Sequence, residues 1–142
     1  IVANDTAYVL MRAVQFFLPG EPQVYYVGLF NGQDDVELFE KTKQGRDVNR
    51  HNYTPSEIKT ALAQPVTQAI IALARVRKHV AFSGEFSWNV TGEATMELRW
   101  VNGSDQLTLT IDTLAPSFVI EETTSAGSKS FSGVDELAQY GL

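Results

Sequence analysis

The stretch GRDVNRH, residues 45–51, concentrates side chains that can bind a ligand. It holds Arg46, Asp47, Asn49, Arg50 and His51, with little apolar surface to bury. An arginine guanidinium offers five N–H donors in a fixed planar fork, which suits paired hydroxyls or a carboxylate. So many hydrogen-bonding groups in one loop raise the question of what they bind.

These groups also have a structural explanation. Arg46 could hold the loop through a salt bridge, and Arg50 and His51 could satisfy themselves by hydrogen bonds within it. Upstream, Asp34 and Asp35 resemble a catalytic pair, but adjacent loop residues point apart, whereas a glycosidase pair needs about 5–9 Å across a substrate. We expect these two aspartates to be solvated and not to form an acid/base pair.

The composition excludes several classes of protein. With 44% hydrophobic and 20% charged residues, the 142-residue chain is typical of a globular domain, and a net charge of −6 argues against non-specific nucleic-acid binding. No apolar run is long enough to span a membrane. The absence of cysteine excludes disulfides and fits a reducing compartment, so we expect a cytoplasmic protein. Neither histidine has metal-ligand spacing, and no metal or cofactor is predicted.

The elements that must position the loop begin with a helix. Asn4 or Asp5 can cap a helix running to about Leu18, whose stripe includes Leu10, Val14 and Phe17. LPGEP (18–22) ends it. QVYYVGLF (23–30) is a near-continuous apolar run, which predicts a strand buried on both faces as in parallel sheets. A long polar excursion follows over residues 31–53, with a short helical turn at 37–43, and long loops of this kind are usually functional.

Ordered structure resumes at TPSE (54–57), where Thr54, Pro55 and Glu57 form a capping box. Pro65 interrupts this helix and can open a second one. The buried face of the second helix is predicted at helical spacing: Val66, Ile70, Leu73 and Val76.

From about Phe82 the apolar period changes to two, which predicts an antiparallel sheet with one apolar face. NGSD (102–105) is interpreted as a turn longer than a two-residue hairpin loop, and TTSAGSKSFSG as a loose tail before a short turn at 134–141. Trp88 and Trp100 could stack on sugar rings, but both fall on the apolar face, so we predict core positions. The alternating side chains are Phe86, Trp88, Val90, Ala94, Met96, Leu98, Trp100, Leu107, Leu109, Ile111, Phe118 and Ile120.

The chain resembles the sucrose phosphorylase subfamily of the alpha-amylase superfamily. RAVQFFLPGEPQVYYVGLFNGQDDVELFEKTKQGRDVNRHNY (12–53) is similar to that family's successive motifs FFLPG-PQVYYVG, AG-ND-EL and GRDINRHYY. PV...LARVRKHVAFSGEFS resembles its last helix and the entry to its C-terminal domain. The resemblance covers roughly residues 4–90 and is only general beyond.

The resemblance implies a fold class that combines α/β with all-β structure. Residues 1–81 would be the last helix-strand-loop-helix portion of a TIM (β/α)8 barrel, and residues 82–142 a small antiparallel β-domain with a loose tail. Residues 23–28 would be the eighth barrel strand, with the following loop on the face where barrel active sites lie. The start at Ile1, without methionine, suits a piece of a longer protein, and we expect the barrel's N-terminal portion to be its missing partner.

The family transfers a glucosyl group to phosphate by double displacement. Its nucleophile, its acid/base and its transition-state-stabilising carboxylate would all precede Ile1, so we expect no catalytic residue in this chain and no activity from it alone. By the resemblance, Arg46 contacts the glucosyl unit, Arg50 and His51 face the anionic acceptor, and Asp35 lies in a mobile acidic loop.

Three functions remain open. The leading one is the C-terminal part of a glucosyltransferase acting on sucrose or a related α-glucoside and inorganic phosphate. The others are a stand-alone carbohydrate-binding module on residues 82–142 and a purely structural domain. We also expect the unpaired strand 23–30 to drive oligomerisation or association with a larger assembly.

Overall fold

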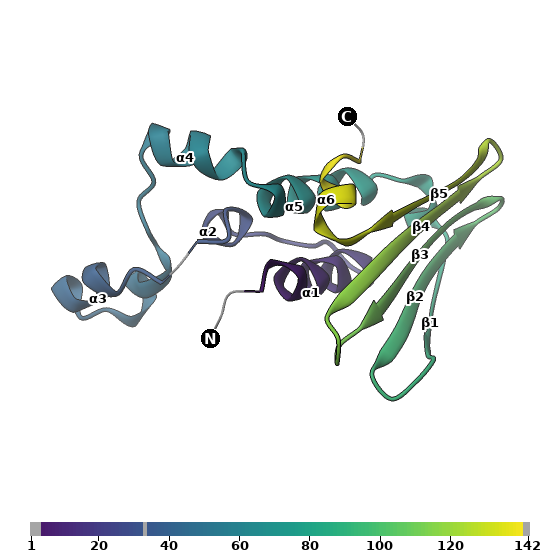
Figure 1. The fold of residues 1–142 in the computed structure, drawn as a ribbon, viewed down its shortest axis with the longest axis horizontal. Coiled ribbons are helices and arrows are strands. Elements are labelled where there is room, and N and C mark those ends of the chain that lie inside the picture. The colour runs from purple at the N-terminus through teal and green to yellow at the C-terminus, as the bar shows by residue number, and fades with distance from the viewer. Residues whose placement is uncertain (1–3, 33, 141–142) are drawn as a thin grey trace.

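A five-stranded antiparallel sheet forms one end of the molecule (Figure 1). The computed structural model describes residues 4–32 and 34–140. Each strand pairs with its neighbour in sequence, so the sheet is a simple meander, as the alternating pattern predicts. The strands are β1 (Glu85–Val90), β2 (Thr95–Asn102), β3 (Asp105–Asp112), β4 (Ser117–Thr124) and β5 (Gly127–Ser132).

The register places the large apolar side chains on one face. Leu98 lies opposite Leu109, and Leu109 lies opposite Ile120, so three central strands contribute to one row. All three side chains are buried. This face must therefore be covered by other elements of the chain.

Two helices, α1 (Asp5–Phe17) and α6 (Gly133–Ala138), contact the sheet, and α5 (Pro65–Val76) packs on both of them. In Figure 1 they lie close together beside the sheet. Helix α1 packs on β2, β3 and β4, and one hydrophobic cluster unites helix and sheet residues. The indole N–H of Trp100 donates a hydrogen bond of 2.7 Å to the carbonyl of Phe17, which fastens α1 to β2. The cluster includes residues on both sides of residue 82, and the domain division at that point stays a prediction.

Local sequence signals place the helix starts correctly. The side chain of Asn4 accepts a hydrogen bond from the N–H of Ala7, and Thr54 and Glu57 form the predicted capping box. Pro65 opens α5, and its predicted apolar face is buried. Leu18, predicted at the end of the α1 stripe, lies just beyond the helix and is exposed. None of the described helices has the length and apolar character required to cross a membrane.

The segment between α1 and α5 extends away from the sheet. It contains α2 (Tyr26–Leu29), α3 (Val36–Thr42), the 3-10 helix η1 (Gly45–Asn49) and α4 (Pro55–Leu62). In Figure 1, α3 lies at the opposite end of the long axis from the sheet. Helices α3 and α4 and η1 contribute no buried side chain.

The strand predicted over residues 23–30 is wrong. Residues 21–25 are irregular, Tyr26–Leu29 is helical, and the N–H of Leu29 donates to the carbonyl of Tyr25. The reason is the lack of a partner, because the described strands pair only with one another in the antiparallel sheet. A short helix satisfies its backbone groups locally, which an unpaired strand cannot do. The oligomer expected from a free strand edge at this segment loses its basis.

Two predictions about the sheet connections are also wrong. Asn102 pairs with Asp105, so the turn between β2 and β3 has two residues, with Gly103 at a φ of 61°. The supposedly loose tail forms β5, which pairs along β4, because backbone pairing needs no apolar side chains. The short final turn predicted at 134–141 is present as α6.

Of the two tryptophans, only one lies in the core. Trp100 is 7% exposed, as predicted, but Trp88 is 64% exposed. Trp88 lies opposite Leu98 and so shares the apolar face, but it belongs to the edge strand β1, outside the strands on which α1 packs. Alternation of apolar and polar residues shows which face of a strand is apolar, but it does not show how much of that face other elements cover.

Candidate functional site

Asp35 connects three parts of the polar segment. One carboxylate oxygen, Oδ1, accepts a hydrogen bond of 2.9 Å from the N–H of Leu38 and so caps α3. The other, Oδ2, lies 2.9 Å from Nδ1 of His51. The backbone N–H of Asp35 donates to the carbonyl of Val48 in η1. Asp35 is therefore a fixed, half-buried group.

His51 bridges two carboxylates. Its second ring nitrogen, Nε2, lies 3.2 Å from Oε1 of Glu57 in the first turn of α4. The other carboxylate oxygen of Glu57 accepts the N–H of Thr54 at 2.7 Å. The contacts Asp35–His51–Glu57, called the His51 link below, join the start of α3 to the start of α4.

The His51 link favours a protonated ring. Hydrogen bonds that the ring donates to Asp35 first, and then to Glu57, raise the pKa of His51 above its ordinary value of 6.5. The hydrogen bond with His51 and that from Leu38 lower the pKa of Asp35. The pKa of Glu57 is lowered first by the N–H of Thr54. When the ring is protonated, it is an imidazolium between two carboxylates, and the cluster carries one net negative charge.

Aromatic rings form one side of the site. The ring of Tyr53 stands edge-to-face against His51, with ring centroids 4.7 Å apart, and it also contacts Phe30 at 5.1 Å. Burial raises the pKa of the Tyr53 phenol. The Tyr26 hydroxyl donates a hydrogen bond of 3.0 Å to the carbonyl of His51. Gly32 lies against the Tyr53 hydroxyl, where no side chain would fit.

An open pocket of about 660 Å³ lies between these groups. Acidic side chains, His51 and aromatic rings all line it. Carboxylates can accept hydrogen bonds from a hydroxylated ligand, and an aromatic face can pack on its carbon atoms. The lining residues are Phe30, Asn31, Gly32, Asp34, Asp35, Val36, Glu37, His51 and Tyr53.

The arginines of the predicted site lie outside this pocket. The Arg46 side chain is 65% exposed on η1, and its Nε is 3.9 Å from Asp47, a distance at which solvent screens the attraction. Arg50 follows η1 and is exposed, close enough to Tyr26 for its charge to act on that phenol. The structure thus brings Asp35 and His51 together and leaves Arg46 and Arg50 apart from them. The substrate-binding roles of all four stay predictions.

Sequence reasoning misses Glu57 and Tyr53 as members of this cluster. Glu57 is predicted only as a capping residue, although His51 lies three positions before the cap Thr54 and can therefore reach the first turn. Tyr53 carries no local signal, since its contact with Phe30 joins residues distant in the chain. Asp35 and Glu57 approach different edges of the His51 ring, and the described residues contain no group of three or more His, Asp or Glu side chains that could hold a metal ion.

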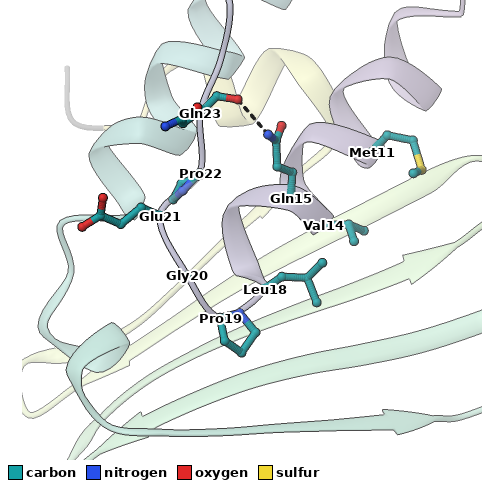
Figure 2. Close-up of a pocket in the computed structure, with 9 residues that line it drawn as sticks. All are labelled: Met11, Val14, Gln15, Leu18, Pro19, Gly20, Glu21, Pro22 and Gln23. Atoms are coloured by element: carbon teal, nitrogen blue, oxygen red, sulfur yellow. Dashed lines mark hydrogen bonds between the residues drawn. The ribbon is translucent and has the colours of Figure 1, made fainter.

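A second open pocket, of about 500 Å³, lies at the end of α1 (Figure 2). Met11 and Val14 border it from the helix, and Leu18 to Gln23 border it from the connection that follows. The side chain of Gln15 donates a hydrogen bond of 2.8 Å to the carbonyl of Gln23 across it. Glu21 is its one ionisable residue, so this pocket offers less chemistry than the one beside His51.

Comparison with known proteins relates the chain to phosphorylases, and no family model matches it. It is 44% identical over 133 residues to the sucrose phosphorylase of Bifidobacterium adolescentis, with 87% of this chain and 26% of that protein aligned. It is 41% identical over 113 residues to the glucosylglycerol phosphorylase of Marinobacter adhaerens, which aligns 79% of this chain and 24% of that protein.

A solved structure gives the same result. The crystal structure of sucrose 6F-phosphate phosphorylase from Thermoanaerobacter thermosaccharolyticum superposes with a TM-score of 0.83 and 36% sequence identity. The match covers 91% of this chain and 26% of that one. The chain spans about a quarter of the length of the relatives that it matches.

These similarities confirm the resemblance seen in the sequence motifs, and the sheet with its helices matches the C-terminal β-domain of the solved phosphorylase. With identities of 34–47%, the chain is homologous to the C-terminal region of the sucrose phosphorylases and sucrose 6F-phosphate phosphorylases.

Proposed function

We propose that this chain is the C-terminal part of a retaining glucoside phosphorylase, which transfers glucose from sucrose or a related α-glucoside to inorganic phosphate. The observation that carries this proposal is the match over 91% of the chain to a sucrose 6F-phosphate phosphorylase structure at 36% identity. Relatives named for sucrose, glucosylglycerol and sucrose 6F-phosphate all align with it. The stand-alone binding module is not favoured, because the alignments with phosphorylases extend over 68–87% of the chain.

In the proposed enzyme, the catalytic carboxylates belong to the portion that precedes the matched region. The chain would contribute a rim to the substrate site, made by the pocket at Asp35 and His51 and by the exposed guanidinium groups of Arg46 and Arg50. Because both ring nitrogens of His51 already face carboxylates, the arginines are better placed than His51 to meet an anion. We further propose a double-displacement mechanism, a cytoplasmic location, and no phosphorolysis by the 142 residues alone.

A chimera tests this proposal. The matching C-terminal region of the Bifidobacterium adolescentis sucrose phosphorylase is replaced by this chain, and glucose 1-phosphate is measured after adding sucrose and phosphate. We expect the chimera to be active and the chain alone to be inactive. Arg46→Ala in the chimera should lower kcat/KM about 10- to 100-fold, the usual cost of losing charged hydrogen bonds to a substrate.

Arg99→Ala is the matched control, because Arg99 lies on β2 and its guanidinium bonds only to Gln106 among the described side chains. It should leave kcat/KM within about twofold of the unchanged chimera, as surface substitutions usually do. A folded chimera without phosphorolysis, or turnover by the chain alone, would reject the proposal.

A further inference from the structure

We propose that His51 is a positioning residue whose ring holds the starts of α3 and α4 together beside the 660 Å³ pocket, and that it does so fully only when both ring nitrogens carry a proton. This inference goes beyond the proposed function in its structural part. Its kinetic part rests on the proposed function.

The first argument is that the partners of His51 are themselves fixed. Each carboxylate gives one oxygen to the ring and the other to a backbone N–H at a helix start, Leu38 in α3 and Thr54 before α4. A carboxylate held at both oxygens has little freedom to rotate. The ring therefore sets the separation of two helix starts.

The second argument is that few other contacts hold these helices. Neither α3 nor α4 buries a side chain, and apart from the His51 link the polar contacts of Asp35 are local or run to η1. Where apolar burial is small, local opening requires little free energy. A single bridging ring can then decide how the segment is arranged.

The third argument concerns the pocket. Residues 34–37, His51 and Tyr53 all line it. The contact of 2.9 Å between Asp35 and His51 joins two of its lining residues that are 16 positions apart in the chain. Breaking this contact would widen the pocket without removing any other lining group.

The fourth argument is the number of protons. An imidazolium has two N–H donors and can donate to both carboxylates, but a neutral imidazole has only one. When the proton leaves to solvent, one nitrogen lone pair must face a carboxylate oxygen, and one of the two contacts is lost. The raised pKa of His51 and the lowered pKa of Asp35 and of Glu57 agree with this coupling.

Other ionisable groups surround the ring and bear on its titration. Glu37 and Asp34 line the same pocket, Tyr53 packs edge-on against the ring, and Arg50 adjoins it in sequence. Lys41 of α3 acts on the Asp35 carboxylate.

The directions of the pKa shifts give the pH range in which the His51 link is complete. A raised pKa stabilises the folded arrangement fully below the ordinary value of 6.5, and this stabilisation is lost as pH rises through the raised value. The lowered pKa values of Asp35 and Glu57 stabilise the folded arrangement when the pH is above the ordinary pKa values of these groups, 3.8 and 4.5. This stabilisation is lost as the pH falls through the lowered pKa values. The His51 link is complete between about pH 4.5 and 6.5.

A pair of variants of the chain tests the link without any assay of activity. In His51→Asn the side-chain amide nitrogen occupies roughly the place of Nδ1 and can still donate to Asp35. In His51→Gln it occupies roughly the place of Nε2 and can donate only to Glu57. We expect hydrogen exchange of the Leu38 amide to be about tenfold faster in His51→Gln and unchanged in His51→Asn, as for one lost hydrogen bond.

NMR titration gives the second readout. The ring of His51 should titrate above 6.5 in the unchanged chain, and closer to 6.5 in Asp35→Asn and in Glu57→Gln. His79→Gln assigns the ring signals, and the indole N–H of Trp100 reports that each variant is folded. Titration of His51 at 6.5, or equal Leu38 exchange in His51→Asn and His51→Gln, would overturn the proposal.

The kinetic readout uses the chimera. His51→Gln should raise KM more than it lowers kcat. His51→Asn, which keeps only the contact with Asp35, should restore KM in part and abolish its change with pH above 6.5. If KM changed with pH in His51→Asn in the same way as in the chimera with His51, the positioning role would be overturned. An inactive chimera rejects only the proposed function, because the exchange and titration measurements need no catalysis.

Discussion

Two regions of this molecule are held by different forces. The inner unit consists of the sheet with α1, α5 and α6, and its side chains form one buried hydrophobic cluster. None of the cluster's buried members comes from the outer segment (residues 26–32 and 34–62) among the described residues, although Leu29 packs against the cluster. Caps, the His51 link and aromatic edge contacts hold it instead.

The inner unit provides the stability of the fold, and the outer segment can change its arrangement. Apolar burial contributes about 25 cal/mol for each Å² removed from water, so the inner unit supplies most of the stability. Exposed polar contacts contribute little each, because solvent competes for the same groups. The outer segment can therefore change its arrangement while the inner unit stays folded, which suits a region that lines a pocket.

The largest expected effect is in the inner unit. Leu109→Ala removes a fully buried side chain from the central strand, between Leu98 and Ile120. It should lower the free energy of unfolding by about 2–5 kcal/mol, measured by denaturant titration, since the cavity cannot fully collapse. Leu114→Ala, where the side chain is 84% exposed, should change it by less than about 0.5 kcal/mol. Equal effects of the two variants would contradict a core centred on β3.

An intermediate effect is expected where α1 meets the sheet. Trp100→Phe keeps an aromatic ring but leaves the buried carbonyl of Phe17 without its indole donor. The loss should be about 1–3 kcal/mol of unfolding free energy in the same titration, the usual cost of an unsatisfied buried group. Trp88→Phe, at the exposed edge, is the matched control and should have little effect. If Trp100→Phe lowered the unfolding free energy as little as Trp88→Phe does, the hydrogen bond would not fasten α1.

The smallest effect is expected in the outer segment. Thr54→Ala removes the capping hydroxyl of α4 and should cost about 1 kcal/mol, confined to that helix. Hydrogen exchange should accelerate in α4 while the amides of β3 stay protected. Thr60→Ala, within the same helix, should not accelerate it, because alanine favours helix. Faster exchange throughout the sheet would mean that the two regions unfold together.

Sequence reasoning succeeds where the signal is local. Asn4, Thr54 and Pro65 mark helix starts by chemistry that acts within three or four residues, and alternation finds β1 to β4 because neighbouring strands share one buried face. It fails where the outcome depends on a distant partner. The apolar run 23–30 is compatible with a strand or a helix, and β5 is recognisable only from its pairing with β4.

The candidate site shows the same division. The family resemblance names Asp35 and His51 among the site residues, and the structure brings them into contact. The sequence does not reveal that Glu57 occupies the other side of the ring, or that Arg46 and Arg50 do not line the pocket, because these facts depend on how η1 and α4 follow each other in space.

The meander order of the sheet has a consequence for folding. Because each strand pairs with the next one along the chain through a short connection, the entropy lost in closing each loop is small. The hydrogen bond between Trp100 and Phe17, in contrast, joins residues 83 positions apart. The hairpins of the sheet should therefore form first, and α1 should dock on the sheet in a later step that completes the core.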